Sequence, residues 1–257
     1  MVGVACGMSA AGKIPFVHSF APFISRRAND QIFISGCYSH ANVKLVGSDP
    51  GIMAAYNGGT HRPFEDVAAL RAFPELTIIE PTDEVMLEKL LHQLVDLKGM
   101  YYIRCARKAV VRLYDSQEEF EIGKGKELRK GTDVTIIASG IMTAESLKAA
   151  DVLAEKGIYA RVVDMFTMKP LDKEHVLKCA EETGAVVTAE NHSMYNGLGS
   201  AVCEVLAENL PVPVERIGIE DEFGEVGDME YLKKRFHLTA EDIVKKAEKA
   251  IERKSKK

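Results

Sequence analysis

Residues 76–103, LTIIEPTDEVMLEKLLHQLVDLKGMYYI, contain two short apolar segments separated by a longer amphipathic one. Residues 76–79 and 100–103 are continuous apolar runs of strand length. Between them, residues 84–95 carry apolar side chains at helical spacing. Continuous apolar strands are typical of parallel sheets covered on both faces, so this stretch predicts a strand, a helix and a strand of an α/β fold.

The same alternation extends through most of the chain. Further strands are expected at residues 43–46, 134–137, 160–163, 186–188 and 212–215, and further helices at 144–156 and 173–183. The chain is therefore predicted to be α/β with largely parallel sheets. Residues 1–11 and 14–17 predict a buried helix that leads into a buried strand, as in the middle of a fold.

Composition and charge exclude several classes of protein. The 257 residues are 46% hydrophobic, which suits two modest cores better than one large core. A net charge of -5 with mixed signs offers no basic surface for nucleic acid or an anionic membrane. No apolar run approaches the roughly 20 residues that a membrane helix needs. The five cysteines form no CxxC or His–Cys cluster, which indicates reduced thiols in a cytoplasmic protein and no metal ligands in this chain.

One segment differs from the alternating pattern. Residues 121–131 are polar and rich in Gly and Lys. They predict a linker between two α/β domains, one at 1–120 and one at 132–257.

Two loops place aromatic or titratable residues outside the regular pattern. Residues 19–23 form a strand-to-helix turn, where open α/β sheets bind ligands, although the spacing of Phe20 and Phe23 alone favours core residues. Residues 56–66 contain paired glycines followed by His61. A histidine on such a loop is free to meet a ligand, but a lone loop histidine is more often solvated.

Three segments in this order carry a family resemblance. They are MVGVACGMSAAGKIPFVHSFAPFISRRANDQI at 1–32, NGGTHRPFEDVAALRAFPELTIIEPTD at 57–83 and ENHSMYNGLGSAVCEVL at 190–206. Together they resemble the C-terminal half of transketolase, as found in organisms that split this enzyme into two subunits. The resemblance runs nearly end to end and implies a thiamine diphosphate pyrimidine-binding fold at 1–120, followed by a transketolase C-terminal domain at 132–257.

The resemblance implies a transferase that moves a two-carbon ketol unit between sugar phosphates, with thiamine diphosphate at an intersubunit site. In the family, Gly-Ile-x-Glu-Gln lies a few residues before the stretch that starts here at Met1. Its glutamate hydrogen-bonds the aminopyrimidine and promotes the imino tautomer. We therefore expect an N-terminal segment, with a strand and this glutamate, to be missing from the sequence.

The resemblance also implies a partner chain. Nothing here resembles the Gly-Asp-Gly and Asn pattern that holds Mg²⁺ and the diphosphate in this superfamily. An N-terminal transketolase subunit is therefore expected to bind Mg²⁺ and the diphosphate, with the pair of subunits assembled as a homodimer.

The site residues follow from matching positions in the family. Phe23 is expected to stack on the aminopyrimidine, and Phe20 to line the same pocket. His61, in Gly-Gly-Thr-His, is expected to contact the sugar and to move protons during catalysis. Arg107 is expected to bind the substrate phosphate through its guanidinium fork, and a plain surface arginine is an equally open interpretation.

Three positions depart from the family. Asn57 replaces a carboxylate that orients the donor sugar, and Arg26 replaces a tyrosine near the cofactor ring. Asp49 replaces a histidine and would repel a sugar phosphate unless a cation intervened. We keep Arg26 with the cofactor-binding residues, and Asn57 and Asp49 with the substrate-binding residues, while the identity of the sugars stays open.

Other functions remain open from the sequence. A 1-deoxyxylulose-5-phosphate synthase-like enzyme shares the Asp30-Gln31 and Thr60-His61 features, and the beta subunit of 2-oxo acid dehydrogenases shares the domain order. The missing glutamate also allows a non-catalytic assembly subunit, whereas the ordered motifs disfavour a plain scaffold. Glu190 and His192 would suggest catalysis if seen alone, but the resemblance makes them structural or interface residues.

Overall fold

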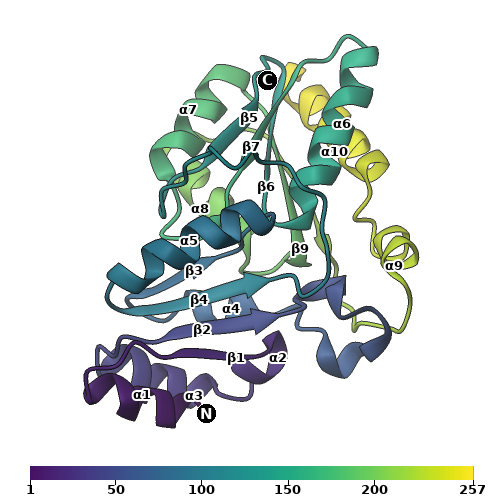
Figure 1. The fold of residues 1–257 in the computed structure, drawn as a ribbon. Coiled ribbons are helices and arrows are strands. Elements are labelled where there is room, and N and C mark those ends of the chain that lie inside the picture. Colours follow the sequence, from purple (N-terminus) through teal and green to yellow (C-terminus); the bar gives the residue numbers. More distant parts are fainter. Residues whose placement is uncertain (257) are drawn as a thin grey trace.

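The computed structural model describes residues 1–256, which form two five-stranded sheets, one above the other in Figure 1. The strands are β1 (Phe16–Phe20), β2 (Lys44–Ser48), β3 (Leu76–Ile79), β4 (Met100–Cys105), β5 (Lys126–Arg129), β6 (Val134–Ala138), β7 (Ala160–Asp164), β8 (Thr167–Lys169), β9 (Val186–Ser193) and β10 (Val214–Ile219). The longer helices are α1 (Val2–Ala10), α4 (Asp66–Arg71), α5 (Glu84–Asp96), α6 (Ile141–Glu155), α7 (Lys173–Thr183), α8 (Leu198–Asn209), α9 (Met229–Arg235) and α10 (Ala240–Ser255). Shorter turns are α2 (Ala21–Ile24), α3 (Asn29–Gln31), the π-helix η1 (Ile32–Tyr38) and the 3₁₀ helices η2 (Gly51–Asn57) and η3 (Gly59–His61).

Both sheets are mostly parallel. The first has the order β1-β2-β4-β3-β8, and the second has the order β10-β9-β6-β7-β5. In each sheet four strands run parallel and one edge strand, β8 or β5, runs antiparallel. The predicted α/β class with largely parallel sheets is confirmed.

Each sheet is covered on both faces, which explains its continuous apolar strands. On the first sheet, α5 packs against one face, and α1, α2, η1 and α4 pack against the other. On the second sheet, α6 and α10 cover one face and α7 and α8 cover the other, as Figure 1 shows. Every residue of β6 and β7 is buried.

The predicted helices begin where side chains cap their free backbone N–H groups. The Asp83 carboxylate accepts the N–H of Met86 at the start of α5, and Asp172 accepts that of His175 at the start of α7. The helices expected at 84–95 and 173–183 are confirmed. None of the helices within residues 1–256 is long and apolar enough to cross a membrane.

Some local predictions were wrong. The last strand begins at Val214, two residues later than expected, and continues to Ile219. The N-terminal segment is not buried among the described residues, because β1 is an edge strand and only three residues of α1 are buried. Met1 and Val4 instead leave 69% and 70% of their surface exposed.

The segment expected to be a linker contains a strand. Within 121–131, β5 pairs antiparallel with β7, and β8 from the second half of the chain pairs with β3 of the first sheet. β5 and β8 are only four and three residues long, respectively, so no apolar pattern marks them in the sequence. The domain ranges 1–120 and 132–257 stay a prediction.

Candidate active site at the edge of the first sheet

Three strands of the first sheet end at the same level. Phe20 of β1 is in register with Ser48 of β2, and Ser48 is in register with Cys105 of β4. Because these strands are parallel, their carboxyl ends meet at one edge of the sheet. The residues that follow them, including Phe23, Asp49 and Arg107, are therefore brought together there.

His61 and two phenylalanines form an aromatic cluster at this edge. The ring centroid of His61 lies 5.4 Å from that of Phe20 and 5.1 Å from that of Phe23, both in edge-to-face geometry. The two phenylalanine rings are 6.1 Å apart. All three side chains are only partly buried, so Phe20 and Phe23 are not the core residues that their spacing favoured.

Arg107 joins this cluster from the loop after β4. Its guanidinium carbon lies 5.0 Å from the Phe20 ring centroid, in a cation–π contact. Asp49, which is 1% exposed, accepts the backbone N–H of Arg107 at 3.2 Å. The Nε of Arg107 lies 2.9 Å from Asp49 Oδ2 in an ion pair that lacks the alignment of a hydrogen bond. A cation of the chain itself thus pairs with the acidic group that was expected to repel a sugar phosphate.

Two predicted residues form no hydrogen bond or ring contact with this cluster in the described part of the chain. Arg26 is exposed and forms an ion pair with Glu65 at 2.7 Å. Asn57 is exposed at the end of η2. Their expected roles toward the cofactor ring and the sugar stay predictions.

Sequence reasoning missed Arg27 as a site residue. Its guanidinium carbon lies 4.5 Å from the Phe23 ring centroid. The separation of four residues from Phe23 is the only sequence signal for this contact. A pyrimidine that stacked on Phe23 would share the ring with Arg27, whose side chain is exposed.

The loop that carries Asp49 is held by the second half of the chain. The Asn191 side chain donates to the carbonyl of Pro50 at 3.0 Å and accepts the N–H of Ile52 at 2.9 Å. Gly51 lies between them with φ +57, and an added Cβ would stand 2.2 Å from the Asn191 amide oxygen. Only glycine fits this combination of left-handed backbone and close contact.

A buried ionic network lies below the site. The fully buried Arg104 donates to Asp66 at 2.8 Å, to Glu80 at 2.7 Å and to the carbonyl of Asn191 at 3.0 Å. Tyr102 donates its hydroxyl to Asp66 at 2.6 Å. The network joins the two sheets, and its arginine was not singled out from the sequence because it lies inside an apolar strand.

Glu190 and His192 belong to this interior and have no exposed surface. Glu190 accepts the N–H groups of Leu198 and Gly199 at 2.7 and 2.8 Å, at the start of α8. Burial raises the pKa of Glu190 to about 7, although these N–H groups oppose the rise. Burial lowers the pKa of His192 to about 4, against the attraction of Asp66. Their assignment as structural or interface residues stays a prediction.

The site fits the pyrimidine of thiamine diphosphate in one respect that the structure shows. Phe23 borders an open hollow of about 430 Å³ between α1 and the α2–α3 segment, so part of its ring is available for stacking. Among residues 1–256, no group of three His, Cys, Asp or Glu side chains is placed to hold a metal ion.

Comparisons with known proteins identify the family. The model of the transketolase pyrimidine binding domain matches residues 1–111, and that of the transketolase C-terminal domain matches residues 123–243. The chain is 52% identical over 255 residues to the 6-deoxy-6-sulfo-D-fructose transketolase subunit SqwH of Clostridium sp. (strain MSTE9), a match that covers 99% of this chain and 79% of that protein. It is 41% identical over 247 residues to a subunit of the apulose-4-phosphate transketolase of Phocaeicola vulgatus, covering 96% of this chain and 79% of that protein.

A solved structure agrees with these matches. It is described as a split gene transketolase in an inactive beta4 tetramer, and it superposes with a TM-score of 0.91 and 42% identity, covering 98% of this chain and 80% of that one. The chain therefore belongs to the transketolase family and contains its pyrimidine-binding and C-terminal domains.

Proposed function

We propose that the chain is the C-terminal subunit of a split transketolase, which transfers a two-carbon ketol unit between sugar phosphates. One observation carries the proposal: His61, Phe20, Phe23 and Arg107 meet at the carboxyl edge of a parallel sheet. This arrangement combines an imidazole that can act as an acid or base, an aromatic surface and a guanidinium at one place. The named relatives, which are transketolase subunits, support the same class of reaction.

Each residue has a distinct role in this proposal. Phe23 offers a ring face to the aminopyrimidine of thiamine diphosphate, and Phe20 closes the side of the same pocket. His61 holds or releases a proton at its imidazole nitrogens while the sugar reacts, and the Thr60 hydroxyl, 3.0 Å from Nδ1, fixes the orientation of the ring. Arg107 binds the terminal anionic group of the sugar. The cofactor, when bound, supplies the carbon nucleophile that accepts the two-carbon unit.

We also propose that the active site is completed by an N-terminal subunit that binds Mg²⁺ and the diphosphate. The support is that the similar structure of another split enzyme is described as an inactive tetramer of its beta chain. A cytoplasmic location is proposed because the five cysteines are all free and four of them are buried.

The test separates cofactor binding from substrate chemistry. The subunit is combined with its N-terminal partner subunit. In this complex, Phe23→Ala should weaken thiamine diphosphate binding by about 1 kcal/mol or more, through the lost aromatic contact. His61→Ala should keep cofactor affinity and lower turnover about a hundredfold. Calorimetric titration and steady-state kinetics measure the two effects.

Controls come from the opposite side of the sheet. Phe16→Ala, at the start of β1, removes a phenylalanine that lies outside the cluster. His92→Ala, on the exposed side of α5, does the same for a histidine. The assignment of His61 would be wrong if its removal weakened cofactor binding as much as Phe23→Ala and left turnover normal at saturation. A complete complex without any ketol transfer would indicate an assembly subunit instead.

A further inference from the structure

Asp49 contacts Arg107, the arginine that joins the aromatic cluster from the loop after β4. Asp49 contacts both the backbone N–H and the Nε of Arg107, at 3.2 and 2.9 Å. The Arg107 side chain is 50% exposed, and its two terminal nitrogens have no hydrogen-bond partner among residues 1–256. The guanidinium therefore presents its free end outward while a negative charge lies against its Nε.

The position of this pair is fixed from two sides. The Phe20 ring lies under the guanidinium at 5.0 Å, and Asp49 is 1% exposed at the end of β2. A substrate anion that meets Arg107 must therefore also come close to the Asp49 carboxylate. At short range and partly shielded from water, that carboxylate repels each additional negative charge on the ligand.

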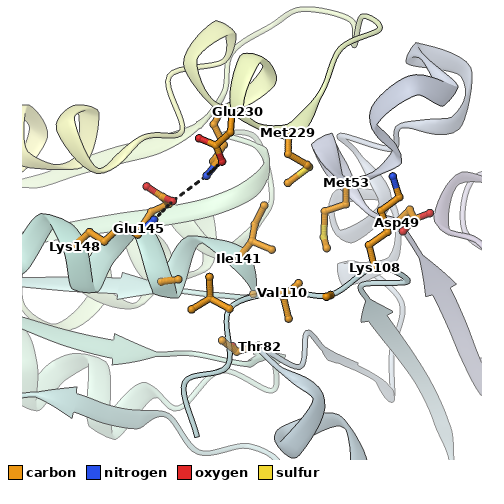
Figure 2. A pocket seen from close by; sticks show the side chains of 15 residues that line it. Asp49, Met53, Thr82, Lys108, Val110, Ile141, Glu145, Lys148, Met229 and Glu230 are labelled. Atoms are coloured by element: carbon orange, nitrogen blue, oxygen red, sulfur yellow. Dashed lines mark hydrogen bonds and ion pairs between the residues drawn. The ribbon is translucent and has the colours of Figure 1, made fainter.

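One further charged side chain lies near Asp49. Asp49 also lines a cavity of about 350 Å³, and Figure 2 shows it at the same end of the cavity as Lys108. Lys108 is exposed and has no ion pair in the described part of the chain. Lys108 is thus the cation that lines this end of the cavity, and Arg107 reaches Asp49 from outside the lining.

Charges at the other end of the cavity satisfy one another. Glu145 pairs with Lys148 at 3.0 Å and with Lys233 at 3.1 Å, and Lys233 also pairs with Glu230 at 2.6 Å. Figure 2 shows Met53, Ile141 and Val110 between this group and Asp49. The two charged ends are thus separated by apolar side chains, and the far lysines are not free to balance a second charge on a ligand at Arg107.

We propose that Asp49 makes this site selective for a sugar whose terminal group carries a single negative charge, a sulfonate, over the matching phosphate ester. The proposal rests on the proposed ketol transfer and names its substrate class. A sulfonate has one negative charge, whereas a phosphate monoester carries about 1.5 to 2 near pH 7. Coulomb repulsion grows with the charge on the ligand, so the Asp49 carboxylate opposes the phosphate ester more strongly than the sulfonate. The relative with 52% identity is named for a sulfonated sugar, which agrees with this selectivity.

The residue at position 49 permits a clean substitution. Asp49 has φ +54, a left-handed backbone that asparagine adopts at least as readily as aspartate. Asp49→Asn therefore removes the charge while it keeps the shape and the acceptor for the Arg107 N–H. Asp96→Asn, in an exposed position at the end of α5 and thus at the opposite edge of the sheet, is the matched control.

The experiment uses the complete complex with two donors that differ only in the terminal group, 6-deoxy-6-sulfofructose and fructose 6-phosphate. The wild type should have the higher kcat/KM with the sulfonate. Asp49→Asn should shift the ratio of the two kcat/KM values toward the phosphate by about tenfold, mostly through KM, as expected for removing one nearby charge. Asp96→Asn should leave the ratio unchanged.

A binding measurement distinguishes failure of this inference from failure of the proposed function. Ethanesulfonate and ethyl phosphate are titrated into the same complexes, with the Arg107 side-chain signals followed by NMR. A preference for ethanesulfonate that Asp49→Asn abolishes supports the inference even if no ketol transfer occurs, in which case the proposed function falls. Ketol transfer with a donor ratio that Asp49→Asn does not change overturns the inference and keeps the function. Equal binding of both anions by the wild type also overturns it.

Discussion

Replacing Arg104 by methionine should expose how much of the fold depends on the buried ionic network. Arg104 makes charge-assisted hydrogen bonds to Asp66 and Glu80 with no exposed surface on the arginine. Methionine fills a similar volume but leaves two carboxylates in the interior without their cation. Removing one partner of a buried pair typically costs about 3–5 kcal/mol, a large share of the stability of a folded domain. We expect Arg104→Met to lower the free energy of unfolding by about that amount near pH 8.

The pH dependence of this loss follows from the two carboxyl groups. Burial by itself raises the pKa of Asp66, but Arg104 and His192 outweigh it and hold the pKa below its usual range. Burial raises the pKa of Glu80, which Arg104 offsets only in part. Without the arginine, burial dominates at both groups, so the folded state binds protons more tightly than the unfolded state. The variant should then regain stability as the pH falls toward the unfolded pKa values, near 4.

Urea unfolding followed by circular dichroism measures this at about pH 5 and about pH 8. The difference between wild type and Arg104→Met should be smaller at the lower pH by at least about 1 kcal/mol. The triple variant Arg104→Met, Asp66→Asn, Glu80→Gln removes the stranded charges and should recover much of the loss at both pH values. Equal losses for Arg104→Met at the two pH values would refute the reasoning, because the loss would then come from packing and not from stranded charge.

Three further predictions concern the site and the interior. Arg107→Ala should raise KM for sugars with a terminal anionic group and spare uncharged sugars, which steady-state kinetics with paired substrates would show; an equal rise for both kinds would count against an anion-binding role. Burial raises the pKa of Asp164 to about 7 despite hydrogen bonds from Thr82 and Tyr114, so its contribution to stability should fall as the pH rises from about 4 to about 7. Asp164→Asn should remove this dependence and gain up to about 4 kcal/mol relative to the wild type across that range in urea unfolding; parallel pH profiles would contradict it. Gly197→Ala places a Cβ 2.0 Å from Glu190 Oε2 and should cost about 2 kcal/mol or more, whereas Gly7→Ala, inside α1 with no atom within 4 Å, should be neutral or stabilise by up to about 1 kcal/mol in the same assay.

The parallel strands and the long helices could be predicted from the sequence because their buried side chains leave a regular pattern: continuous apolar runs for the strands and helical spacing for the helices. The predicted helix at 84–95 lies within α5, and the one at 173–183 coincides with α7. In both, the apolar spacing and an aspartate cap indicate the same start. The two antiparallel edge strands could not be predicted, since three or four residues carry no period. The exposure of α1 was also missed, because an apolar helix predicts burial only if something in the chain packs against it.

The site itself depended on the family resemblance more than on pattern. Periodicity favoured Phe20 and Phe23 as core, and the structure leaves both partly exposed beside His61. The contact of Asp49 with Arg107 bridges 58 positions and depends on the register of β2 with β4. Sequence spacing contains no information on that register, so the pairing of Asp49 with Arg107 is seen only in three dimensions.

The second half of the chain has a larger part in the site than packing alone. Asn191, near the carboxyl end of β9, bonds both sides of Gly51 and thereby fixes the turn that presents Asp49. Arg62, next to His61, donates to the carbonyls of Ala55 and Glu225 and so ties the far end of the same loop to the segment before α9. A loop with several residues at positive φ is costly to order on its own. The C-terminal half therefore determines the geometry of a site whose aromatic and charged groups all come from the N-terminal half.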